Sequence, residues 1–234
     1  MAYIYGLVKF FDNPKYADAF SNGQLHAERL RYFKNLEDES AGRGDKYEGV
    51  AANLQLHKGR LIIGEHRFTS GSASIQMNWL DYLNVFCMHA IHGGDFELTS
   101  ENLGDFRKCL EIPEEGLRKF GKYGVAITDV PQFIDRVKTK ARLQGYQVWN
   151  KLVKYYDPET SHEFFGKGLN SPEAEFNKHN KYRWQREFRF VIHTGVAGTK
   201  AIDLDIGDIS DISFPIDIAD INKGIKIQAS RSSS

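Results

Sequence analysis

Cysteine is scarce in this chain of 234 residues, which contains only Cys87 and Cys109. Two thiols are too few for a disulfide scaffold or for a zinc site with four thiolate ligands. Net charge is absent as well, because 31 Lys and Arg residues balance 31 Asp and Glu residues. The sequence therefore predicts neither the global positive field of many nucleic-acid-binding proteins nor the acidic excess of a disordered chain.

Long hydrophobic runs are also missing. No stretch of 18 uncharged apolar residues occurs, so we expect no transmembrane helix. Residues 1–10 lack the basic segment, apolar segment and cleavage site of a signal peptide. We therefore expect a cytoplasmic protein with both thiols reduced and no contact with a membrane.

Glycine-rich nucleotide motifs are absent too. The chain contains no GxGxxG or GxxxxGK[ST] pattern and no regular series of βαβ units, which disfavours Rossmann and P-loop folds. Aromatic residues are plentiful at 13%. The mixed order of helical and strand-like segments predicts a single α+β domain over residues 1–229, followed by a disordered tail at 230–234.

The hydrophobic patterns predict individual elements. Apolar spacing and end signals favour helices after Asn13, ending at Asn22-Gly23, and over 131–143, with further helical spacing over 98–120. Alternating apolar residues and turn signals likewise predict strands and irregular stretches elsewhere in the chain. We expect strands at 3–10, 25–33, 82–91, 123–127, 146–156 and 188–193, a hairpin of 54–56 and 61–63 that turns at Lys58-Gly59, loops at 34–49 and 157–180, and short strands and turns in the Ile-rich C-terminal segment.

Two clusters could carry simple hydrolytic or metal chemistry. Cys87 and His89 would face one way on a strand, with His92 nearby, but no second pair completes a tetrahedral metal site. The serines around Ser72 do not form a GxSxG elbow. A buried core cysteine is the better interpretation of Cys87, and a Cys/His-dependent hydrolase remains an alternative.

The segment 182–192 (YRWQREFRFVI) is the most informative. With a period of two, Gln185, Glu187 and Arg189 would share one face of a strand, while apolar residues pack on the other. A surface Glu–Arg pair is the simple structural explanation. Alternatively, a Gln-x-Glu pair at the head of a strand suits chemistry on a ribosyl carbon, where a carboxylate stabilises an oxocarbenium-like transition state.

Gln185-x-Glu187 resembles the Gln/Glu-x-Glu motif of ADP-ribosyltransferases. The wider layout is similar to a bacterial family of unknown function for which the same fold is expected. The similarity covers most of residues 3–193, and its pieces occur in a fixed order. They are Leu7-Val8-Lys9-Phe10, Asn22-Gly23, the loop residues Arg43, Asp45, Glu48 and Gly49, then 84–88 (NVFCM), 121–125 (GKYGV), 133–137 (FIDRV) and finally the Gln-x-Glu strand.

The resemblance implies a split, mostly antiparallel sheet and a reaction in which NAD donates ADP-ribose. It implies that Glu187 is catalytic, that Gln185 orients the acceptor, and that Lys9 or Arg43 contacts the diphosphate. Tyr47 would stack on nicotinamide, or else belong to a surface turn. Either Ser72 or the strand around Phe86 would complete the NAD site.

The resemblance also implies a bacterial toxin or phage-defence effector, with an antitoxin as a possible partner. The acceptor would be an RNA or DNA base or a protein amide. The residues expected to bind it are Lys178, Lys181, Tyr182 and Arg189. Together with the basic segment 136–154, whose aromatic residues are Tyr146 and Trp149, they could form a basic surface. A solvated cationic helix face and a non-catalytic nucleic-acid-binding protein are the alternatives.

Two geometric expectations follow. Lys9, the loop 43–49, the strand 84–89 and Glu187 should line one cleft. Replacement of Glu187 by glutamine should leave the melting temperature unchanged, because its backbone lies in a strong strand and an exposed Glu–Arg pair contributes only about 0–1 kcal/mol.

Overall fold

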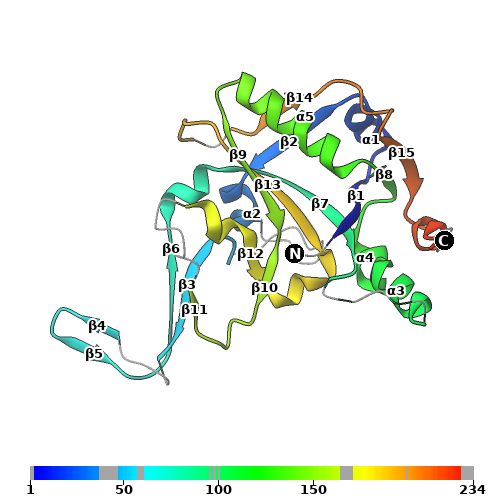
Figure 1. Cartoon of the computed structure of the whole chain (residues 1–234). Helices are drawn as coiled ribbons and strands as arrows, with labels where there is room; N and C mark the ends of the chain where they lie inside the picture. The colour runs from blue at the N-terminus through cyan, green and yellow to red at the C-terminus, as the bar shows by residue number, and fades with distance from the viewer. Residues whose placement is uncertain are drawn as a thin grey trace, which may run out of the picture.

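The computed structural model describes residues 3–36, 47–56, 61–94, 96, 99, 101–163, 171–198 and 200–227. Its largest sheet has eight strands, and most of its strands come from segments far apart in the sequence (Figure 1). They are β1 (Ile4–Phe11), β2 (Gln24–Arg29), β7 (Asn84–His92), β8 (Tyr123–Ile127), β9 (Gln147–Leu152), β13 (Glu187–His193), β14 (Ile202–Asp205) and β15 (Ser213–Asp217). All pairings within it are antiparallel, which confirms the α+β class with a mostly antiparallel sheet.

The central strand β7 has two different neighbours along one of its edges. Strand β13 pairs with residues 84–89 on one edge. On the other edge, β2 pairs with Asn84 and Val85, whereas β1 pairs with residues 89–92. The edge of β7 at residues 86–88 therefore lies in a gap between β1 and β2. This gap divides the sheet into two arms that share β7 and β13.

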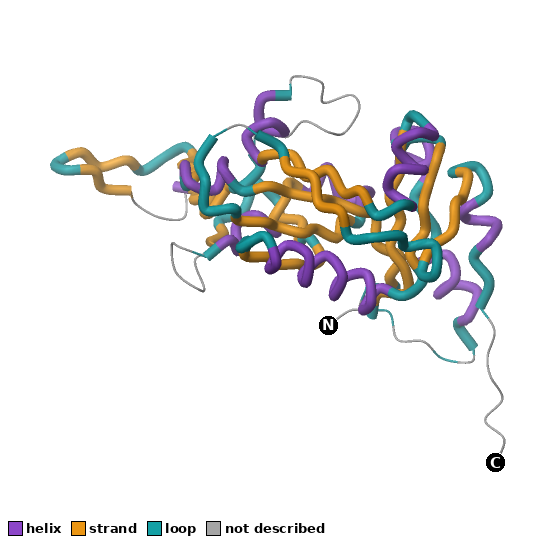
Figure 2. The backbone as a smooth tube through the Cα atoms, turned by 90° about the horizontal axis from the view of Figure 1, so that it is seen from above, coloured by secondary structure: helices purple, strands orange, loops and turns teal. Residues whose placement is uncertain are grey.

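Two helices cover one face of the sheet. They are α1 (Pro14–Ser21) and α5 (Val130–Leu143), and both appear across the sheet in Figures 1 and 2. Each has a proline at its first or second position, Pro14 or Pro131, and is capped by a residue whose side chain accepts a backbone N–H bond, Asn13 or Asp129. Phe20 and Phe133 are almost fully buried against Phe190 and its neighbours in the largest apolar cluster.

The opposite face carries smaller elements. They are the helices α2 (Leu30–Asn35), α3 (Leu103–Leu110), α4 (Glu114–Lys119) and α6 (Ile221–Gly224), and the 3-10 helices η2 (Asn78–Tyr82), η3 (Pro172–Phe176) and η4 (Asn180–Gln185). Strands β3 (Val50–Gln55), β6 (Ser72–Gln76) and β11 (His162–Glu163) form a second sheet, and β10 (Lys154–Tyr156) pairs in parallel with β12 (Asn177–His179). A hairpin of β4 (Leu61–Ile63) and β5 (His66–Phe68) projects from the body (Figure 1).

Several expected elements are confirmed. The helices after Asn13 and over 131–143 and the strands near 3–10, 82–91, 123–127, 146–156 and 188–193 are present within a residue or two, the segment 146–156 forming both β9 and β10. The C-terminal segment forms short strands and turns with the short helix α6, as expected. The expected tail at 230–234 lies outside the described residues.

Other expectations are wrong. The strand 25–33 ends at Arg29, and the chain turns into α2, whose Leu30 N–H donates to the Leu83 carbonyl. Leu54 does not pair with the segment 61–63, because β3 pairs with β6 instead. By contrast, the helical spacing expected over 98–120 is confirmed by α3 and α4, which are separated at Ile112-Pro113. No helix in the described part of the chain is long and apolar enough to cross a membrane.

Candidate functional site

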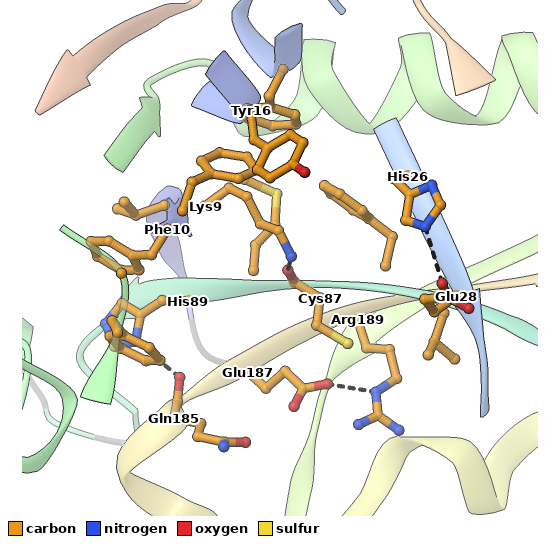
Figure 3. A pocket seen from close by; sticks show the side chains of 18 of the residues that line it. Lys9, Phe10, Tyr16, His26, Glu28, Cys87, His89, Gln185, Glu187 and Arg189 are labelled. Atoms are coloured by element: carbon orange, nitrogen blue, oxygen red, sulfur yellow. Dashed lines mark hydrogen bonds and ion pairs between the residues drawn. The ribbon is translucent and has the colours of Figure 1, made fainter. Parts of the chain in front are cut away.

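A cavity of about 970 Å³ occupies the gap between β1 and β2 (Figure 3). Its floor is residues 85–89 of β7, and its walls come from β1, α1, β2, β13, β14 and residues 119–121. This volume lies at the upper end of the range for small-molecule and cofactor sites. The expected cleft is confirmed in part. Lys9, Glu48, residues 85–89 and Glu187 line the cavity, whereas Tyr47, Gly49 and Asn84 do not, and residues 43–46 lie outside the described residues.

Lys9 bridges the gap in the sheet. Its ammonium group donates a hydrogen bond of 2.8 Å to the Cys87 carbonyl, which lies on the edge of β7 between the two arms. The same Nζ lies 4.7 Å from the centroid of the Phe86 ring. Lys9 thus satisfies a backbone acceptor that a continuous sheet would pair with a neighbouring strand, and it places a positive charge in the cavity.

Glu187 belongs to a closed ring of four buried charges. Arg189 Nε donates to Glu187 Oε1 at 2.6 Å, and the Arg189 guanidinium binds both oxygens of Glu48 at 2.8 and 3.1 Å. Lys178 Nζ lies 3.0 Å from Glu48 Oε1 and 3.4 Å from Glu187 Oε2. All four side chains are at least nine-tenths buried. The simple explanation of an exposed Glu–Arg pair is therefore wrong, because Glu48 and Lys178, the latter on β12, cover this face of β13.

The ring fixes the ionisation of both carboxyl groups. Burial alone would raise the pKa of Glu187, but the positive charges of Arg189 and Lys178 outweigh it and hold this pKa well below its usual range. The same balance lowers the pKa of Glu48, and the two carboxylates raise the pKa of Lys178 despite its burial. Glu187 is therefore a carboxylate at neutral pH, and the ring holds it in place.

Two neighbouring groups complete the surroundings of Glu187. The Glu187 N–H donates to the Tyr155 hydroxyl at 2.9 Å. Cys87 lies beside the carboxylate, as Figure 3 shows. Burial and the negative charge of Glu187 raise the pKa of this thiol to about 12. Cys87 therefore stays protonated, which argues against the alternative of a cysteine nucleophile.

Gln185 lies at the cavity but not on the strand. It ends η4, and Arg186 follows with a positive φ of 45° before β13 begins at Glu187. The expected common strand face of Gln185 and Glu187 is therefore wrong. The Arg186 guanidinium stabilises this turn by donating to the carbonyls of Cys109, Glu111 and His92. Glu187 and Arg189 do share a face, as expected, opposite the buried Phe188 and Phe190.

The two ends of the cavity differ in character. Around His89, aromatic rings predominate, with Phe10 stacked on Phe120 at 4.8 Å between centroids and Trp184 beside Phe120. At the other end, His26 on β2 lies 2.7 Å from Asp203 on β14 and 3.1 Å from Glu28. Partial burial lowers the pKa of His26, but the hydrogen bonds and charges of these two carboxylates raise it overall.

The sequence-based site residues separate into three groups. Lys9, Phe86, Lys178, Gln185, Glu187 and Arg189 line the cavity. Four others lie outside its lining: Ser72 is exposed on β6, Tyr47 packs near His179, and Lys181 lies over the ring of Tyr182. Arg43 lies outside the described residues.

The expected basic surface is wrong in its composition. Lys178, Tyr182 and Arg189 are buried, so they cannot present charge or a stacking ring to a nucleic acid on the outside of the protein. Arg136 on α5 is paired with Asp211, and Lys151 on β9 is paired with Glu173. These carboxylates offset two of the six cationic residues of the 136–154 segment.

Several residues at the site were not identified from the sequence. Three of them lie at the end of the cavity opposite the aromatic rings: His26, Glu28 and Asp203. Only the pairing of β2 with β14 brings these three side chains together. Trp184 also lines the cavity, but the alternation within the segment 182–192 gives no sign of that role. Within the described residues, no three His, Cys, Asp or Glu side chains are grouped so that they could hold a metal ion.

Comparison with known proteins adds no identity: no family model, no curated protein and no solved structure matches this chain.

Proposed function

We propose that this protein is an NAD-dependent ADP-ribosyltransferase that modifies a nucleic-acid base or a protein amide. The observation that carries the proposal is the position of Glu187. A carboxylate with a lowered pKa, held on a strand, lines a cavity that opens in the gap of an antiparallel sheet, and Lys9 lines the same cavity. This arrangement agrees with the split sheet and the Gln-x-Glu motif that the resemblance implies.

In the proposed reaction, the bond between nicotinamide and the ribose anomeric carbon breaks, and nicotinamide leaves with the bonding electron pair. Positive charge develops on the ribose, and Glu187 stabilises it. A carboxylate offers about four acceptor positions, so the bonds to Arg189 and Lys178 leave room for a ribose hydroxyl. A nitrogen of the acceptor then forms the new bond to the anomeric carbon and loses its proton.

The other lining residues have supporting roles. Lys9 and Lys119 supply positive charge for the diphosphate, although the Lys9 ammonium also holds the Cys87 carbonyl. The side chain of Gln185, two residues before Glu187 in the chain and in the lining of the same cavity, orients the acceptor amide or base. The protonated thiol of Cys87 takes no part as a nucleophile.

The decisive assay measures release of nicotinamide and transfer of label from NAD to RNA, DNA or protein. A single Glu187→Gln variant is ambiguous, because it also unbalances the buried charges. We therefore pair it with Glu187→Gln/Lys178→Gln, which keeps the ring neutral. Both variants should lose about 10²–10³-fold in rate, including the balanced one. Full activity in the folded double variant, or no nicotinamide release by the wild type with any acceptor, would contradict the proposal.

The proposed toxin or phage-defence role has its own test. Expression of the wild-type chain in bacterial cells should arrest growth, whereas the balanced double variant should be tolerated at the same protein level. Gln185→Ala should reduce transfer to the acceptor more than hydrolysis of NAD. Growth arrest by both the wild type and the inactive variant would separate toxicity from the transferase reaction.

A further inference from the structure

His89 is a buried hydrogen-bonding group with an unused acceptor. It lies on β7 and is only 3% exposed. Its Nδ1 atom is 2.9 Å from the Gln185 carbonyl oxygen, whereas Nε2 is buried without a hydrogen-bond partner among the described residues. A buried polar atom left without a partner is costly, so an atom of this kind in the lining of a cavity suggests contact with a ligand.

The tautomer of His89 follows from the hydrogen bond between Nδ1 and the Gln185 carbonyl. A carbonyl oxygen can only accept, so Nδ1 must carry the proton and Nε2 must present a lone pair. Burial and the positive charge of Arg186, together outweighing the Gln185 contact, lower the pKa of His89 to about 3. The imidazole therefore remains neutral near pH 7, and Nε2 remains an acceptor that requires an N–H or O–H donor.

Flat rings surround this acceptor. The His89 ring lies 5.6 Å from Phe120 and 6.4 Å from Phe10, measured between ring centroids, and both contacts are edge-on. Trp184 extends the same wall, 5.2 Å from Phe120. Figure 3 shows Phe10 and His89 at the same end of the pocket as Gln185. Such an environment favours a planar aromatic ring that carries a single hydrogen-bond donor.

The position of His89 relative to Glu187 indicates which ring of NAD would contact the imidazole. The two residues are direct cross-strand partners on β7 and β13. Direct partners in an antiparallel pair have Cβ atoms about 4.5–5.5 Å apart. If Glu187 acts at the ribose that carries nicotinamide, as the proposed function requires, the ring next to that ribose is the one within reach of His89.

We propose that His89 Nε2 accepts a hydrogen bond from the carboxamide NH₂ group of NAD and thereby selects the amide form of the pyridine ring. This inference rests on the proposed function for the placement of the ring. A nicotinic acid ring would bring a carboxylate against the imidazole lone pair and near Glu187. A methyl ketone in place of the amide would keep the shape of the substituent but would lack the N–H donor.

Calorimetric titration of the full chain tests this selection with three probes: NAD, its 3-acetylpyridine analogue and its nicotinic acid analogue. Loss of one hydrogen bond to a buried acceptor corresponds to about a tenfold preference for NAD over the ketone. The nicotinic acid analogue should bind more weakly still. In His89→Phe, which keeps a ring of similar size, the preference for NAD over the ketone should fall to within about twofold. His193→Phe, at the far end of β13 and outside the cavity lining, is the matched control.

The outcomes separate this inference from the proposed function. Equal binding of NAD and the ketone by the wild type, or an unchanged preference in His89→Phe, would overturn the role of His89 even if NAD were consumed. If the preference for NAD over the ketone is lost in His89→Phe but kept in His193→Phe, the role of His89 is supported even if no transfer is detected. Absence of all NAD binding would overturn both. Should His89→Phe fail to fold, the wild-type ranking of the three probes still decides.

Discussion

Replacing Glu187 with glutamine is expected to destabilise the protein strongly, and this result would distinguish a buried charge ring from a surface pair. The substitution leaves Arg189 and Lys178 facing only Glu48, with one unbalanced positive charge in a region that water scarcely reaches. Breaking a buried ion pair by removing one partner costs about 3–5 kcal/mol. For a chain of this size, that corresponds to a fall of about 6–20 °C in melting temperature.

A second substitution should recover part of this loss. Lys178→Gln in the same chain removes the unbalanced charge and leaves the bidentate Arg189–Glu48 pair, with its bonds of 2.8 and 3.1 Å. Groups in one charge network couple by about 0.5–3 kcal/mol, so the double variant should be more stable than the sum of the single variants predicts. Lys178→Gln alone should also be destabilising, because it leaves two carboxylates for one guanidinium.

The measurement is a double-mutant cycle of thermal and urea unfolding for the wild type, the two single variants and the double variant. Lys138→Gln, on the outer part of α5, is a control for the loss of a positive charge, and it should change stability by less than about 0.5 kcal/mol. A wild-type melting temperature for Glu187→Gln, or strictly additive losses in the double variant, would refute the account of a buried, ionised ring.

Three further predictions concern single groups. Lys9→Met should cost about 1–3 kcal/mol, measured by urea unfolding, because the Cys87 carbonyl loses its ammonium donor. His89, neutral when folded and with a pKa of about 3, should cause wild-type stability to fall by about 2 kcal/mol from pH 6.5 to 5, because only the unfolded histidine gains a proton; His89→Phe should lack this component of the slope. Burial raises the pKa of Glu175 well above its usual range, and both of its oxygens lack partners among the described residues, so Glu175→Gln should stabilise the protein increasingly as pH rises above the ordinary glutamate pKa.

Helices and strands with strong local signals could be predicted from the sequence. Helix α5 has a proline in its first turn, an aspartate cap and an apolar face, and it lies where the pattern placed it. The end of β2 could not be predicted, because α2 begins without a side-chain cap, and the turn depends on a bond from Leu30 to the distant Leu83 carbonyl. The turn expected at Lys58-Gly59 lies outside the described residues, and the strand pairing expected across it is wrong for a related reason, because β3 pairs with β6.

The candidate site could also be predicted from the sequence only in part. The alternation of β13 correctly placed Glu187 and Arg189 together on one face. It could not show that the face is buried, because the side chains that cover it are Glu48, 141 residues away from Arg189, and Lys178 on β12. Local periodicity reports which residues share a face, whereas the partners of that face depend on long-range topology.

The gap in the sheet also explains why a binding cavity and a rigid charge ring occur together. Opening β7 between β2 and β1 gives up backbone pairing at residues 86–88, and Lys9 compensates at Cys87. Along the other edge, β13 pairs with β7 without interruption from Asn84 to His89, and β9 pairs with β13 in turn. Glu187 therefore lies on a strand that remains fully supported beside the gap. A carboxylate that must stabilise charge in a transition state without moving requires this kind of support.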